Sequence, residues 1–100
     1  MAWGRSRTRE QDIAAFAAWL DDLVAAHERM SADEYLFELL NAPECGGIGR
    51  RAREMVASLP GGVAVSAATV ATLIDRLDRE LASARFSTVA QQVKQRLGAS

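Results

Sequence analysis

The sequence predicts an all-α protein, a compact bundle of about five helices. Apolar residues recur at three- and four-residue steps along several segments, which gathers them on one side of a helix. Serine or threonine stands where a helix-capping residue belongs at several segment starts, and proline and glycine interrupt the chain between segments. The helices are expected at about 8–30, 32–40, 48–59, 67–83 and 88–97.

Length and composition suit one folded domain. The chain has 100 residues, of which 49% are hydrophobic and 25% charged, so it is apolar enough to form one core. We expect a single helical domain at 8–98, preceded by a flexible basic tail at 1–7. The tail contains Trp3, Arg5 and Arg7.

Several features predict a cytoplasmic location. No apolar run is long enough to cross a bilayer, and the N-terminal segment lacks the apolar stretch of a signal peptide. The single cysteine, Cys45, has no partner for an internal disulfide, which agrees with a reducing compartment. Frequent alanine, together with arginine in place of lysine, is typical of GC-rich bacterial genes.

The first two helices have the clearest start signals. Thr8 and Gln11 have the spacing of a capping box, and so do Ser31 and Glu34. Met30 and Tyr35 take the positions of a hydrophobic staple around the second box. The helix at 32–40 is apolar over a broad arc, which predicts a central helix covered on most sides.

The remaining helices follow two breaks. The segment 41–47 contains proline and paired glycines, and 60–62 reads Pro-Gly-Gly, so both are expected to be loops. Ser66 is expected to cap the fourth helix. The apolar stripes of 67–81 and 86–97 point in different directions on one straight helix, so we expect a turn near 83–87 with Ser87 as the next cap. One long helix serving two partners is the alternative.

Formal charge divides the chain. Between Glu10 and Glu44 there are nine acidic residues and one basic residue, whereas from Cys45 onward four acidic residues accompany eight basic ones. Either the two halves pair internally, or they leave opposite charges on separate surfaces. Separate surfaces favour head-to-tail association that weakens with salt. The candidate partner-binding residues are Arg50, Arg51, Arg53, Asp21, Asp22 and Glu28.

No catalytic or metal constellation is evident. Cys45 precedes an expected helix start and two arginines, a setting that lowers a thiol pKa, but catalysis needs a base and the only histidine is His27. No pair of histidine or cysteine has zinc-ligand spacing. We therefore expect no enzyme activity, no metal and no cofactor, and no small-molecule substrate is evident.

The segment 46–51, Gly-Gly-Ile-Gly-Arg-Arg, is a candidate anion site. Free backbone N–H groups at Gly46 and Gly47, with the guanidinium groups of Arg50 and Arg51, suit a phosphate. The segment lacks the lysine and spacing of a P-loop and does not match the dinucleotide fingerprint. A plain connector followed by a solvated basic face is the other interpretation.

The segment 65–77, Val-Ser-Ala-Ala-Thr-Val-Ala-Thr-Leu-Ile-Asp-Arg-Leu, resembles the recognition helix of winged-helix repressors of the MarR type. The resemblance implies a helix-turn-helix formed by 48–59 and 67–83, and nucleic acid as a partner. The chain departs from that pattern in its long connection at 60–66, in the absence of a wing hairpin, and in the acidic residues mixed with Arg76 and Arg79.

Taken together, these features favour a small non-enzymatic protein-interaction module, either an adaptor or a self-association domain. Its partner is expected to be another protein or a second copy of the chain. A small helix-turn-helix-like DNA-binding protein is the alternative. No membrane partner is expected.

Overall fold

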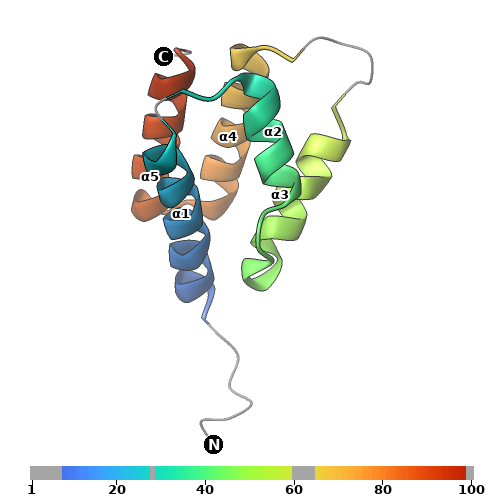
Figure 1. Cartoon of the computed structure of the whole chain (residues 1–100). Helices are drawn as coiled ribbons and strands as arrows, with labels where there is room; N and C mark the ends of the chain where they lie inside the picture. The colour runs from blue at the N-terminus through green and yellow to red at the C-terminus, as the bar shows by residue number, and fades with distance from the viewer. Residues whose placement is uncertain (1–7, 28, 60–64, 99–100) are drawn as a thin grey trace, which may run out of the picture.

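Five α-helices and one 3-10 turn make up the computed structural model, which describes residues 8–27, 29–59 and 65–98. The all-α prediction is confirmed (Figure 1), and the described ranges contain no strand. The expected tail at 1–7 lies outside the described residues. The elements are α1 (Arg9–Ala26), α2 (Ala32–Leu40), η1 (Cys45–Gly47), α3 (Ile48–Ala57), α4 (Ala67–Leu81) and α5 (Ala84–Leu97).

The predicted caps of the first, second and fourth helices are confirmed. Thr8 and Gln11 form a reciprocal capping box at the start of α1, and Ser31 with Glu34 forms another at α2. The Ser66 hydroxyl accepts a hydrogen bond from the backbone N–H of Thr69 at the start of α4. Each bond satisfies a backbone donor that has no partner within the helix.

The break between the last two helices lies earlier than expected. Ala82 has a left-handed conformation (φ 49°, ψ 48°), and the Ser83 hydroxyl accepts from the N–H of Phe86, so α5 begins at Ala84 and not at residue 88. The expected cap at Ser87 is wrong, because two residues suffice to reverse the chain. The Ser87 hydroxyl instead donates a hydrogen bond to the Asp78 carboxylate, which joins α5 to α4.

Three expected helix ends also lie too far along the chain. Helix α1 ends at Ala26 and not at residue 30, since His27 has an extended backbone (φ −130°, ψ 120°) and the chain must turn before the Ser31 cap. Helices α3 and α4 each end two residues before their expected limits.

Two groups of helices share one core. Helix α5 packs against α1 and α4, while α2 packs against α3 and α4. Helices α4 and α5 run in opposite directions, as Figure 1 shows. The rings of Phe16 in α1 and Phe86 in α5 lie 5.9 Å apart, and both side chains are fully buried. The other side chains with no exposed surface are Leu20, Leu39, Ala52, Val70, Ile74, Ala90 and Val93.

No helix in the described ranges has both the length and the apolar character needed to cross a bilayer.

The left-handed turn between α4 and α5 generates a stability prediction. Alanine at a left-handed position is strained by its Cβ, whereas glycine adopts this conformation without that penalty. Ala82→Gly is therefore expected to raise the free energy of unfolding by about 0.5–1 kcal/mol, despite glycine's greater freedom in the unfolded chain. Urea unfolding followed by circular dichroism measures the change.

The matched control lies two residues further on. Ala84 is an exposed residue in α5, so Ala84→Gly places the same substitution in a helix, where it is expected to cost up to about 1 kcal/mol. Destabilisation by Ala82→Gly of the same size as that caused by Ala84→Gly would contradict a left-handed Ala82.

Candidate interaction surface

Helix α2 has one buried face and one apolar patch in solvent. Tyr35, Leu36 and Leu39 are buried, but Phe37 is 65% exposed and Leu40 is 45% exposed. These are the exposed large hydrophobic residues of the described part of the chain, and both belong to α2. The expectation of a helix covered on most sides is therefore wrong. Neighbouring helices reach only the face that carries Tyr35 and Leu39.

A depression lies beside Phe37, where α2 follows the end of α1. Its volume is about 440 Å³, and the exposed part of its wall is mostly apolar. Met30, which is buried, forms part of the floor. The lining residues are His27, Met30, Asp33, Glu34, Phe37 and Glu38. We name this depression, with Leu40 beside it, the α2 patch.

The rim of the α2 patch is acidic. Asp33, Glu34 and Glu38 supply three carboxyl groups around the apolar wall. The pKa of Glu34 lies below its usual value, chiefly because the backbone N–H of Ser31 donates to its carboxylate, at 3.0 Å. Glu34 is therefore ionised at neutral pH. An apolar centre with a negative rim suits a partner that offers an apolar side chain flanked by cations.

The predicted arginine cluster, Arg50, Arg51 and Arg53, lies on α3 and already has carboxylate partners. Glu44 accepts from Arg50 at 2.7 Å and from Arg53 at 2.9 Å. Arg53 also donates to the carbonyl of Ala42 at 2.6 Å. These contacts hold the loop before α3 against its first turns. Arg50, with 68% of its side chain exposed, remains the most accessible of the three.

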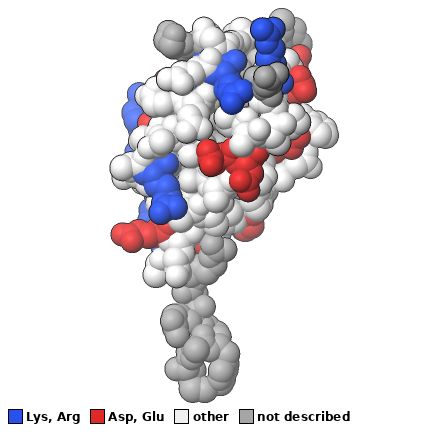
Figure 2. Space-filling model, turned by 60° about the vertical axis from the view of Figure 1, so that its left-hand side comes forward, with Lys and Arg blue, Asp and Glu red and all other residues white. Residues whose placement is uncertain are grey.

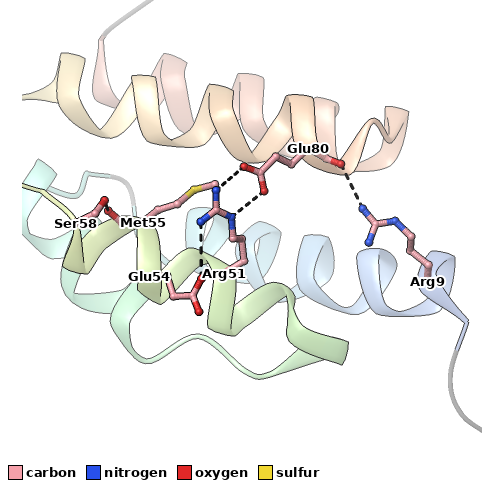
Figure 3. Close-up of polar contacts among 6 residues, drawn as sticks. All are labelled: Arg9, Arg51, Glu54, Met55, Ser58 and Glu80. Atoms are coloured by element: carbon pink, nitrogen blue, oxygen red, sulfur yellow. Dashed lines mark hydrogen bonds and ion pairs between the residues drawn. The ribbon is translucent and has the colours of Figure 1, made fainter.

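The remaining arginine of the cluster joins two helices (Figure 3). Arg51 on α3 makes a two-pronged contact with Glu80 on α4, with Nε to Oε1 at 2.9 Å and the second nitrogen to Oε2 at 2.8 Å. The Arg51 hydrogen bonds lower the pKa of the Glu80 carboxyl. Arg9 at the start of α1 donates to the Glu80 carbonyl at 3.3 Å. Helices α1, α3 and α4 therefore meet at Glu80.

Pairing on α4 differs from the pattern that spacing suggests. Asp75 and Arg79 are four residues apart, as are Arg76 and Glu80, but Asp75 instead binds Lys94 of α5 at 2.7 Å. Glu80 is bound by Arg51. Among the described residues, neither Arg76 nor Arg79 forms an ion pair, and both are exposed. The outer side of α4 therefore presents two arginines.

The glycine segment after Glu44 is shaped by close packing. Gly46 is left-handed (φ 62°), and a Cβ built on it would lie 2.0 Å from Oδ2 of Asp12, so a carboxylate of α1 lies against this backbone. The N–H groups of Gly47 and Gly49 both donate to the carbonyl of Glu44. An anion at Gly46 and Gly47 would meet the Asp12 charge, which disfavours the predicted anion site.

Gly49 is needed for a second close approach. A Cβ at Gly49 would lie 1.8 Å from the carbonyl oxygen of Pro43, a backbone atom. Only a residue without a side chain lets the loop cross α3 at this distance. The glycines that suggested a phosphate cradle thus have a structural explanation.

Cys45 and His27 lie far apart. Cys45 is half-buried in η1, next to Gly46, which contacts Asp12 in the first turns of α1. His27 follows the last residue of α1. Fifteen residues of helix separate Asp12 from His27, which corresponds to about 22 Å. Cys45 and His27 therefore do not form a nucleophile and base pair, and no group of three metal-ligating side chains occurs among the described residues.

The predicted acidic residues that the structure describes belong to α1, whereas the arginine cluster belongs to α3. Asp21 and Asp22 are exposed on α1, and no ion pair joins them to another described residue. Glu28 lies outside the described residues. Figure 2 shows a face on which acidic and basic side chains both occur and neither forms a continuous patch.

The sequence contained a signal for the α2 patch that was missed. At 100° per residue, Tyr35, Leu36 and Leu39 fall within one arc, whereas Phe37 lies about 150° from the middle of that arc. Leu40 lies about 90° from the middle. A helix packed on one side leaves such positions in solvent. The partners of Arg51 and Lys94 had no comparable signal, because they come from other helices.

Comparisons of the chain with protein families, with curated proteins and with solved structures gave no match.

The contact between Arg51 and Glu80 predicts a specific pH dependence. Because the pKa of Glu80 in the folded protein is below its usual value of about 4.5, its ionised form stabilises the fold above that pH. This contribution is lost as the pH falls below 4.5 and through the folded-state pKa. Glu80→Gln is therefore expected to be less stable than the wild type at pH 7, with a gap that closes toward pH 3.

Urea unfolding midpoints across this pH range measure the gap. Arg51→Gln is expected to reproduce the loss at pH 7, and the double variant to add little to either single one. Asp22→Asn, an exposed carboxyl on α1 without an ion pair among the described residues, serves as the control. A gap between Glu80→Gln and wild type that stays constant from pH 7 to pH 3 contradicts the assigned role.

Proposed function

We propose that this chain is a small non-enzymatic protein-interaction domain that acts in the cytoplasm as an adaptor or by self-association. The observation that carries the proposal is the concentration of exposed apolar surface on α2 at Phe37 and Leu40. Burying such side chains against a partner is favourable by about 25 cal/mol for each Å² removed from water.

The surroundings of the two side chains support the same function. The depression beside Phe37 offers a recess for an apolar group, and its acidic rim selects for a partner with positive charge. In contrast, Arg51 and Arg53 already serve contacts within the fold. The α2 patch is therefore a better candidate contact surface than the arginine cluster that the sequence suggested.

A double substitution tests the proposal. Phe37→Ser with Leu40→Ser is expected to abolish binding of protein partners, including further copies, because it removes the apolar contact area. The fold should persist, since both side chains are exposed. Sedimentation velocity and retention of proteins on the immobilised chain measure binding, and circular dichroism with urea unfolding measures folding.

The control places the same new residue elsewhere. Ala57→Ser with Ala68→Ser changes exposed positions of α3 and α4 and is expected to bind like the wild type. Binding retained by the α2 double variant, or lost equally by the control, contradicts the proposal.

DNA binding through α3 and α4 is a second proposed function, and one observation favours it. Lys94 and Arg51 engage Asp75 and Glu80, which leaves Arg76 and Arg79 exposed on α4. Glu80 lies beside these two arginines, but its carboxylate is already bound by Arg51, and exposed arginines suit phosphate contacts.

A gel shift with mixed duplex DNA at low salt tests the DNA proposal. The wild type should retard the duplex, and Arg76→Ala with Arg79→Ala should weaken retardation and its salt dependence. Thr72→Ala, at an exposed position of the same helix, is the control. Absence of retardation by the wild type removes this function.

A further inference from the structure

We propose that the α2 patch receives the N-terminal segment of a second copy of this chain. In this arrangement Trp3 enters the depression, and Arg5 and Arg7 meet the carboxylates of the rim. The inference rests on the proposed protein-interaction function and names its partner.

The first support is chemical complementarity. The depression combines an apolar wall formed by Met30 and Phe37 with the carboxyl groups of Asp33, Glu34 and Glu38. The segment before α1 carries one large aromatic residue and two arginines, and it has no acidic residue. Tryptophan and arginine, together with tyrosine, are enriched among the residues that dominate binding energy at protein interfaces.

The spacing of the segment is the second support. Trp3, Arg5 and Arg7 occupy alternate positions. In an extended chain, alternate side chains point to the same side. An extended segment therefore offers its aromatic ring and both guanidinium groups to one surface. The size of the depression, about 440 Å³, falls within the range of sites that hold a compact organic group.

The length of the segment before α1 bears on whether the depression receives the chain's own segment or that of another copy. Thr8 caps the start of α1, whereas His27, which lines the depression, follows its end. The 18 residues of α1 separate the two by about 27 Å. Five extended residues from Thr8 back to Trp3 span at most about 18 Å. In its own molecule the backbone at Trp3 therefore falls short of the depression floor near His27 and Met30, which favours a second copy as the source of the occupant.

Two single substitutions in the full chain break opposite sides of this contact. Trp3→Ala removes the inserted group, and Phe37→Ser removes the wall that receives it. Each is expected to weaken self-association at least tenfold in sedimentation velocity experiments at concentrations up to about 1 mM. Wild-type association should also weaken as salt rises, because two arginines and three carboxylates contribute.

Mixing the two variants provides the decisive test. The Trp3→Ala copy keeps an intact depression, and the Phe37→Ser copy keeps an intact segment. An equimolar mixture should therefore form a one-to-one dimer with wild-type affinity at its single restored contact, although each variant alone associates at least tenfold more weakly. No restoration in the mixture overturns the inference.

Charge is tested by a pair of substitutions that change the net charge equally. Glu38→Gln removes one carboxylate from the rim and should weaken association, whereas Gln91→Lys, on the exposed side of α5, should leave it unchanged. Equal effects of the two substitutions would indicate a general charge effect and overturn the inference.

Failure of this inference is distinguishable from failure of the proposed function. If the wild type stays monomeric up to about 1 mM while the Phe37→Ser and Leu40→Ser double variant loses a different protein partner, self-docking is overturned and the interaction function stands. If the α2 double variant retains every protein contact of the wild type, both are overturned.

Discussion

Helix α4 has an apolar stripe that must be buried, and α2, α3 and α5 pack against it. Val70, Leu73, Ile74, Leu77 and Leu81 are all buried along this stripe. Its polar residues also bind other helices, since Asp75 pairs with Lys94 of α5 and Glu80 with Arg51 of α3. Burial supplies most of the stabilisation, whereas these partly exposed ion pairs link α4 to its neighbours and contribute less.

The position of α2 follows from that arrangement. It packs against α3 and α4 with Tyr35 and Leu39, and its opposite side has no neighbouring helix in the described part of the chain. Phe37 and Leu40 are therefore left in solvent, beside carboxylates that belong to the same helix. The candidate contact surface is thus a direct consequence of a five-helix bundle that covers only one face of its shortest α-helix.

The division of charge along the chain is only partly bridged by ion pairs among the described residues. Arg50 and Arg53 pair with Glu44, which crosses the boundary between the acidic and basic halves. Lys94 and Arg51 pair with carboxylates of their own half. Both sets of ion pairs join neighbouring segments of the fold. The carboxyl groups at the rim of the α2 patch are not part of these pairs, and they lie next to exposed apolar surface.

The sequence by itself determined the helical class, the number of helices and most of their starts, because apolar periodicity and serine or threonine caps act within a few residues. It placed the break before α5 four residues too late, since a left-handed Ala82 has no marker in the sequence. Only the tertiary structure decided which charges pair and which face of α2 stays open. Those outcomes depend on residues distant in the chain: Arg51 finds Glu80, and Asp12 lies against Gly46, only when the helices have packed.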